Sequence, residues 1–123
     1  MIEIKDAPEE QKVSRPVLPE IKNPEVLRRA IRTYGTQEQA DMAIEEMSEL
    51  IKALIKERRA IQGNWPDLPK AMNDVVEEIA DVYIMLSQLI MIYDYNDWVQ
   101  AEVDKKIERL AKRLKKAERK ESI

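Results

Sequence analysis

Residues 69–93 read PKAMNDVVEEIADVYIMLSQLIMIY, and this stretch decides the fold class. Its apolar residues recur every three or four positions, which is the period of one face of an α-helix. The expected core stripe consists of Met72, Val75, Ile79, Val82, Leu86, Leu89 and Tyr93. In the second half apolar residues also lie outside this stripe, so we expect the helix to be covered on several sides, partly by another subunit.

The flanking segments show the same period and predict three more helices. Asn23 and Pro24 are typical of a helix start, and Gly35 is typical of a left-handed helix end. Thr36 with Gln39 predicts a capping box for a helix that runs to about Ala60. A last helix is expected after Asp94-Tyr95-Asn96. The expected core positions of these three helices are Val26, Leu27, Ala30 and Ile31; Ala43, Met47, Leu50 and Leu54; and Val99, Val103, Ile107, Leu110 and Leu114.

Length and composition agree with a single helical domain. The chain has 123 residues, only 2 Gly and no Phe, and no stretch has the alternating pattern of a strand. Residues 1–22 carry three prolines among charges and show no sustained period, so we expect an extended or disordered arm there. The expectation is an all-α, four-helix-type bundle over residues 23–123.

Two absences limit the chemistry of the chain. It has no Cys and no His, which excludes disulfides, thiolate zinc sites, histidine-ligated iron and Ser–His or Cys–His dyads. Any metal must therefore bind to oxygen. The N-terminus has no signal-peptide pattern and the apolar run is too short and too polar to span a bilayer, so we expect a cytoplasmic protein that is not in a membrane.

Charge is unevenly distributed along the chain. Residues 105–121 hold 9 Lys/Arg against 3 Asp/Glu, whereas the rest of the chain is acidic. A basic helical tail can bind nucleic acid, but basic residues also suit the solvated C-terminal end of a helix. We expect the second role and no stable binding of nucleic acid.

The same acidic pattern occurs in two of the expected helices, as IEEMSEL at 44–50 and VEEIADV at 76–82. In each copy the second and the last acid lie one turn apart at the edge of the apolar stripe, whereas Glu45 and Glu77 point away. If the two helices pack antiparallel at ~8–10 Å, four carboxylates converge. They belong to Glu46, Glu49, Glu78 and Asp81.

Four adjacent carboxylates repel each other unless a cation or protons neutralise them. Oxygen ligands without His favour Mg²⁺, with Mn²⁺ as a substitute, and Mg²⁺ typically shares its remaining positions with water and phosphate oxygens. Solvated acids on amphipathic helices are the alternative interpretation, but the doubled pattern favours a metal site. Di-iron bundles need Glu-x-x-His motifs and calcium loops need an Asp/Gly-rich loop, and neither is present.

These motifs resemble the signature of the all-α nucleoside triphosphate pyrophosphatases, the MazG-like group, which is EExxE followed after a gap by ExxD. Here Glu45-Glu46-Met47-Ser48-Glu49 is followed after 28 residues by Glu78-Ile79-Ala80-Asp81, and the resemblance extends from Thr36 to about Arg113. It implies that Glu46, Glu49, Glu78 and Asp81 bind Mg²⁺, the same four residues that the helical phases select.

Many members of this group also carry an Asn-x-Lys-x-x-Arg element that contacts the triphosphate. Lys106 and Arg109 match its Lys and Arg, whereas Asp104 stands at the Asn position. Lys106 and Arg109 share a helix face and can donate charged hydrogen bonds to phosphate, although a solvated basic surface explains them equally well. Tyr93 is a candidate for stacking on the base, with core packing as the alternative.

We therefore expect a Mg²⁺-dependent nucleoside triphosphate pyrophosphohydrolase that acts on the nucleotide pool, with Glu46, Glu49, Glu78 and Asp81 as metal-binding and catalytic residues. A homodimer or homotetramer is the expected assembly, as the resemblance also implies. Two alternatives remain open. One is a non-enzymatic helical interaction module, and the other is a phosphoribosyl-nucleotide pyrophosphohydrolase of the same superfamily.

Overall fold

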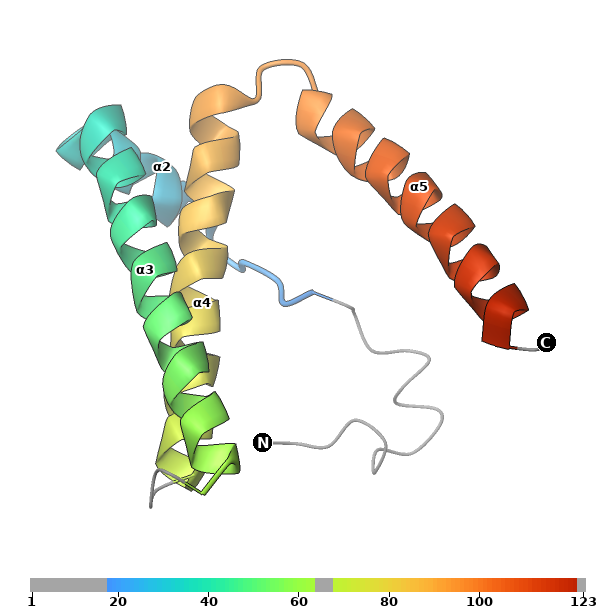
Figure 1. The fold of residues 1–123 in the computed structure, drawn as a ribbon. Coiled ribbons are helices and arrows are strands. Elements are labelled where there is room, and N and C mark those ends of the chain that lie inside the picture. Colours follow the sequence, from blue (N-terminus) through green and yellow to red (C-terminus); the bar gives the residue numbers. More distant parts are fainter. Residues whose placement is uncertain (1–17, 64–67, 122–123) are drawn as a thin grey trace. The chain divides into compact units, whose positions relative to one another are not determined.

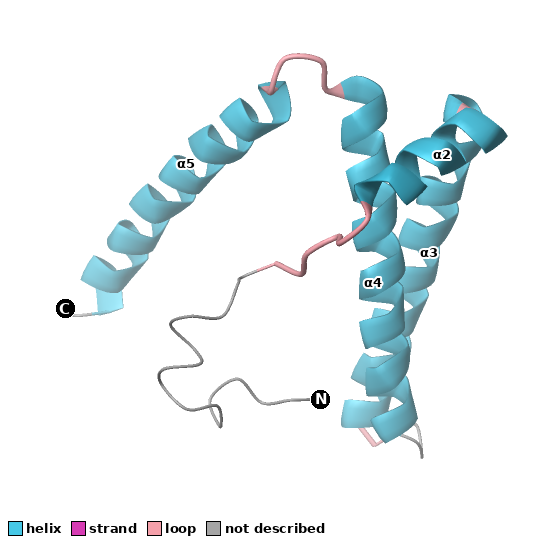
Figure 2. Cartoon of the chain, turned by 180° about the vertical axis from the view of Figure 1, so that it is seen from behind, coloured by secondary structure: helices cyan, strands magenta, loops and turns pink. Residues whose placement is uncertain are grey.

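The computed structural model describes residues 18–63 and 68–121, and within these ranges the regular structure is entirely α-helical (Figures 1 and 2). The helices are α2 (Pro24–Tyr34), α3 (Thr36–Ile61), α4 (Leu68–Tyr93) and α5 (Trp98–Glu121). This confirms the all-α prediction with its four helices. The chain divides into two compact units, Met1–Leu89 and Ile90–Ile123.

Helices α3 and α4 lie side by side and run in opposite directions, forming a hairpin (Figure 1). Small and medium side chains are buried along one face of each of the two helices, and we call these positions the seam. They are Ala43, Ala53, Ala60, Ala71, Val75, Val82 and Met85. Because alanine lets two helix backbones approach closely, the seam holds α3 and α4 near each other.

The predicted core stripe was partly wrong in its helical phase. Ala43, Val75 and Val82 are buried as expected, and Leu50, Met72 and Leu89 are half-buried. The exposed members of the stripes predicted for α3 and α4 are Met47, Leu54, Ile79, Leu86 and Tyr93. Alanine contributes little to a hydrophobic pattern. The predicted stripes were therefore centred on larger side chains that follow the buried positions by one residue.

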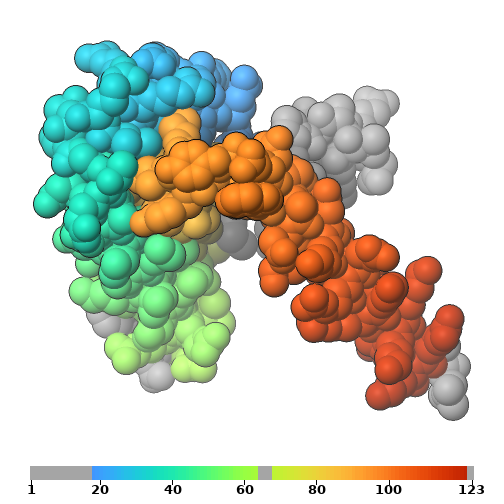
Figure 3. Space-filling view, turned by 90° about the horizontal axis from the view of Figure 1, so that it is seen from above, coloured from blue at the N-terminus to red at the C-terminus, as the bar shows by residue number. Residues whose placement is uncertain are grey.

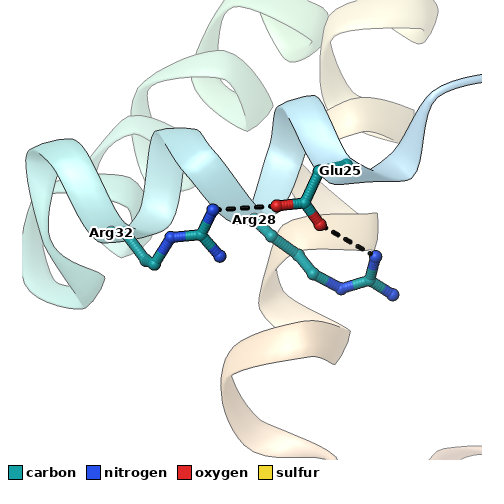
Figure 4. Close-up of polar contacts among 3 residues, drawn as sticks. All are labelled: Glu25, Arg28 and Arg32. Carbon is teal, nitrogen blue, oxygen red and sulfur yellow. Dashed lines mark hydrogen bonds and ion pairs between the residues drawn. The ribbon is translucent and has the colours of Figure 1, made fainter.

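Helix α2 packs against the N-terminal part of α3, and Figure 3 shows both at one end of the first unit. Leu27 is its buried anchor, with 8% of its surface exposed. On its outer side Glu25 accepts hydrogen bonds from Arg32 (2.8 Å) and Arg28 (3.5 Å), as Figure 4 shows. These exposed pairs contribute little to stability, so the docking of α2 depends on Leu27.

Gly35 ends α2 as predicted, but its ψ of 154° is not that of a left-handed helix end, and the prediction for Thr36 was wrong. Gly35 has a φ of 97°, a backbone conformation that favours glycine, and its N–H donates to the carbonyl of Ile31. Gly35 is also the N-cap of α3, and no side chain caps that helix. Thr36 is therefore the first helical residue, and the predicted capping box with Gln39 does not form.

Helix α5 begins after Asp94-Tyr95-Asn96, as predicted, with Trp98 as its first residue. Asp94 Oδ1 accepts hydrogen bonds from the N–H groups of Trp98 (2.8 Å) and Val99 (3.4 Å), which satisfies the free start of the helix. The predicted apolar stripe of α5 is present along the helix but exposed within its unit, contrary to the expectation that it is core. Lys112 and Glu108 form an i,i+4 ion pair at 3.7 Å.

Only the last part of the predicted N-terminal arm falls within the described residues. There the Tyr83 hydroxyl donates to the Pro19 carbonyl at 2.8 Å, which ties the segment before α2 to α4. Residues 1–17 lie outside the described part of the chain. In the described ranges, no helix has the length and apolarity needed to cross a bilayer.

Candidate metal centre

Three carboxylates from α3 and α4 meet beside the seam. Glu46 comes from α3, and Glu78 and Asp81 come from α4. Each offers one oxygen, and these oxygens lie within 4.8 Å of one another. Glu78 and Asp81 are one turn apart, so they project side by side, and the close approach of the helices brings Glu46 to them. The two acidic motifs therefore meet in space. The first motif contributes Glu46, and the second contributes Glu78 and Asp81.

Burial and mutual repulsion act on the same two acids. Glu46 and Glu78 are half-buried, whereas Asp81 is exposed. Loss of solvent raises the pKa of Glu46, and the charges of Asp81 and Glu78 raise it further. Loss of solvent also raises the pKa of Glu78, with the charges of Asp81 and Glu49 adding to it and a hydrogen bond with Glu46 opposing it. The site therefore disfavours its own negative charge when no cation is near.

One oxygen of this cluster has no partner. The Oε2 atom of Glu78 is buried and accepts no hydrogen bond from any described residue. A buried carboxylate oxygen without a donor loses the hydration that normally stabilises it. A bound cation would satisfy this oxygen and relieve the repulsion among the three acids.

Glu49, the fourth predicted ligand, lies at the edge of the cluster rather than in the group of three. Its side chain is exposed, and Oε1 is 3.9 Å from the Lys52 ammonium. Its charge nevertheless raises the pKa of both Glu46 and Glu78. Glu49 therefore contributes to the negative potential of the site.

The two acids predicted to point away do so. Glu45 and Glu77 are exposed, and Glu77 accepts a hydrogen bond from Asn73 at 3.3 Å. Neither belongs to the group of three. These two residues are natural controls for the acids of the cluster.

The predicted substrate-binding residues lie in the second unit, Ile90–Ile123. Lys106 and Arg109 are exposed on α5, and Tyr93 is exposed at the end of α4. Arg109 lies among basic side chains that line a pocket on α5: Lys112, Arg113, Lys115, Lys116 and Arg119. The arrangement suits an anion.

Two residues near the hairpin were missed by the sequence interpretation. Gln39 on α3 and Gln88 on α4 are buried, and Gln88 has only 3% of its surface exposed and an amide oxygen with no partner among the described residues. The only sequence signal was that Gln88 interrupts the apolar run of its helix.

The donor set of the cluster suits a hard divalent cation. It consists of carboxylate oxygens only, it carries negative charge, and one of its oxygens is buried without a partner. Mg²⁺, Mn²⁺ and Ca²⁺ prefer such ligands, whereas zinc and iron favour the sulfur and nitrogen donors that this chain lacks. Comparison of the chain with family models, curated proteins and solved structures gives no match.

Proposed function

We propose that the protein is a Mg²⁺-dependent pyrophosphohydrolase that converts a nucleoside triphosphate to the monophosphate and pyrophosphate. The observation that carries the proposal is the convergence of the Glu46, Glu78 and Asp81 oxygens within 4.8 Å, with a buried oxygen of Glu78 left without a partner. Polyphosphates bind divalent cations, and carboxylates can hold the same cation, so a carboxylate site suits such a substrate. The doubled acidic motif and its resemblance to MazG-like pyrophosphatases support the same conclusion.

Glu46, Glu78 and Asp81 would hold the cation, with Glu49 at the edge of the site. Bound there, Mg²⁺ supplies Lewis acidity toward a phosphate oxygen and lowers the pKa of a coordinated water. The half-buried carboxylates of Glu46 and Glu78 would hold the cation on its protein side. An exposed carboxylate oxygen of Asp81 or Glu49 orients the attacking water and accepts its proton.

By the resemblance to MazG-like pyrophosphatases, Lys106, Arg109 and Tyr93 would bind the remainder of the substrate. Lys106 and Arg109 are one turn apart on α5 and would donate charged hydrogen bonds to the phosphates of the leaving pyrophosphate. Tyr93 would stack on the base. In this proposal the enzyme acts in the cytoplasm as a homodimer or homotetramer.

Pyrophosphate release from a panel of nucleoside triphosphates, measured with Mg²⁺, with Mn²⁺ and with a chelator, tests the proposal. We expect release that requires the divalent ion and that Glu46→Gln abolishes. Glu45→Gln is the matched control, because it removes the same charge from the neighbouring, outward-facing residue. Release by the chelated enzyme, or equal loss in both variants, would refute the proposal.

A non-enzymatic interaction module is the second candidate, favoured by the exposed apolar stripe and basic pocket of α5. Isothermal titration with Mg²⁺ separates the two candidates. The enzyme needs stoichiometric binding that Glu78→Gln removes, whereas the module needs none. A phosphoribosyl-linked nucleotide included in the panel tests the remaining alternative.

A further inference from the structure

Two buried glutamines lie two helical turns from the acidic cluster. Gln39 precedes Glu46 by seven residues on α3, and Gln88 follows Asp81 by seven residues on α4. Because seven residues are close to two helical turns, each glutamine lies on the same helix face as its acid. All four residues belong to the first unit, Met1–Leu89. We call Gln39 and Gln88 the glutamine pair.

The glutamine pair lies at one end of the hairpin. Because α3 and α4 are antiparallel, the residues before Glu46 and the residues after Asp81 lie toward the same end (Figure 1). The carboxylate oxygens of Glu46 and Asp81 are within 4.8 Å of each other, and an equal shift of seven residues along both helices keeps them in register. Gln39 therefore lies opposite Gln88, about 10 Å from the carboxylates along the helix axes.

The amide of Gln88 lacks a hydrogen bond that its burial demands. Gln88 is 3% exposed and Gln39 is 8% exposed. The Oε1 atom of Gln88 accepts no hydrogen bond from any described residue. Buried amide oxygens in proteins are almost always paired, and an oxygen without a protein donor needs water or a ligand. The glutamine pair therefore offers a buried acceptor to an N–H or O–H group that the described residues do not supply.

Among the described residues, two buried side-chain oxygens lack a partner, and both lie on α4. They are Oε2 of Glu78 and Oε1 of Gln88. The first is a carboxylate oxygen that suits a cation, and the second is a neutral amide oxygen that suits a hydrogen-bond donor. A nucleoside triphosphate offers both groups, because its phosphates carry a divalent cation and its base, at the other end, carries N–H groups. The two unpartnered oxygens therefore match the two ends of such a substrate.

We propose that the glutamine pair binds the base of the nucleotide, with Oε1 of Gln88 accepting a hydrogen bond from an N–H group of the base. The proposal rests on the proposed function, because it assumes that the acidic cluster holds the cation of the phosphates. An amide presents an acceptor beside a donor, so it pairs with a base edge that presents an N–H group beside an acceptor. Such a site rejects a base without the N–H group, since the buried amide then stays unpaired. The glutamine pair thus makes the enzyme selective for the base.

Steady-state kinetics with two triphosphates tests the proposal. One is the best substrate of the panel, and the other is an analogue whose base carries no N–H group: the 2-pyrimidinone nucleotide for a pyrimidine or the unsubstituted purine nucleotide for a purine. We expect the unaltered protein to show a kcat/KM for the analogue that is lower by about tenfold or more. Gln88→Met keeps the length of the side chain and removes its amide, so it should abolish this difference by lowering kcat/KM for the best substrate.

Gln100→Met is the matched control. Gln100 is an exposed glutamine of α5, and its amide already donates a hydrogen bond to Asp104 at 2.9 Å. The control should keep the base preference of the unaltered protein. Gln39→Met provides a second variant in case Gln88→Met does not fold, and it should reduce the preference as well. Circular dichroism establishes that all variants remain helical.

A binding measurement separates this proposal from the proposed function. Isothermal titration with the two nucleoside monophosphates, in the presence of Mg²⁺, gives the base preference without turnover. A preference that Gln88→Met removes, in a protein that releases no pyrophosphate, would refute the pyrophosphohydrolase and support the role of the glutamine pair. Equal pyrophosphate release from both triphosphates by the unaltered protein would overturn the role of the pair and leave the pyrophosphohydrolase.

A purely structural amide gives a different result. If water alone satisfies Oε1 of Gln88, then Gln88→Met changes the melting temperature and leaves the base preference as it was, which would overturn the proposal. Failure of every nucleotide to bind would overturn it too.

Discussion

Glu46 on α3 and Glu78 on α4 hold carboxylate oxygens within 4.8 Å of each other on helices that run in opposite directions. Both side chains are half-buried beside a seam of small residues, and loss of solvent together with the charge of Asp81 raises the pKa of each. Half-buried carboxylates that lie close together lower the stability of the fold unless a ligand neutralises them, and such groups are typical of functional sites.

Each of Glu46→Gln, Glu78→Gln and Asp81→Asn should lower turnover by more than about 100-fold, because residues that only support a metal ligand already contribute about 10–100-fold. Pyrophosphate release at saturating Mg²⁺ measures the loss. Glu77→Gln is the control for Glu78→Gln and should stay near the unaltered rate. Wild-type rates in all three cluster variants would show that the carboxylates do not bind a catalytic ion.

Without divalent ions, the stability of the protein should fall as the pH rises. The folded-state pKa values of Glu46 and Glu78 are raised above 4.5, so the folded chain binds more protons than the unfolded chain in the window between 4.5 and the raised values. The stabilising contribution of these two groups is present below pH 4.5 and is lost as the pH rises through their folded pKa values. Urea unfolding at a series of pH values, with a chelator present, measures the trend.

Glu78→Gln should flatten that pH dependence and raise the melting temperature of the metal-free protein at neutral pH. Mg²⁺ should restore stability to the unaltered chain and have little effect on the variant, because a ligand stabilises the state that binds it. An unaltered chain whose metal-free stability is independent of pH would contradict the repulsion described for the cluster.

Lys106→Ala and Arg109→Ala should each lower kcat/KM for the triphosphate by about 10- to 100-fold, since a charged hydrogen bond contributes about 1.5–3 kcal/mol. Mg²⁺ binding to the free protein should be unchanged, because neither residue belongs to the acidic group. Lys105→Ala is the matched control, as that lysine is paired with Glu102 at 3.4 Å. Steady-state kinetics measures the effect. If the double variant keeps the unaltered kcat/KM, Lys106 and Arg109 do not bind the substrate and are only part of the solvated surface.

Leu27→Ala should destabilise the first unit by about 2–5 kcal/mol, the range for removing a buried leucine side chain. Leu27 is 8% exposed and is the buried residue of α2, whereas neighbouring Val26 is 49% exposed. Val26→Ala should therefore cost much less, and the urea midpoints of the two variants give the comparison. Equal costs would mean that α2 is not held by Leu27.

Helix bounds could be predicted well from this sequence, and helix faces less well. Asn23, Pro24 and Gly35 bracket α2 where the structure places its ends, because proline has the φ of a helix start and glycine can adopt a positive φ at a helix end. The face of α3 depends instead on which residues meet α4, and four alanines decide that contact. Since alanine is common on every helix face, the sequence pattern favoured the larger neighbours Met47 and Leu54.

The acidic cluster was predictable for a different reason. Acids at the same place in two helical motifs converge once the helices are antiparallel, and Glu46, Glu78 and Asp81 do so. Glu49 stands at the same place in its motif as Asp81, but its exposed carboxylate lies outside the group of three and 3.9 Å from the Lys52 ammonium. The amide of Gln88 could not have been found, since its burial depends on surroundings from distant parts of the chain.

The alanines of the seam have a consequence for ion choice. They determine how near the α3 backbone comes to α4, and this distance limits the span that Glu46 must bridge to reach Glu78 and Asp81. A larger side chain at Ala43 or Ala53 would force the helices apart and widen the oxygen cage without touching any acid. Mg²⁺ requires oxygens at about 2.0–2.1 Å and Ca²⁺ accepts about 2.3–2.6 Å, so such a change should shift preference from the smaller cation to the larger.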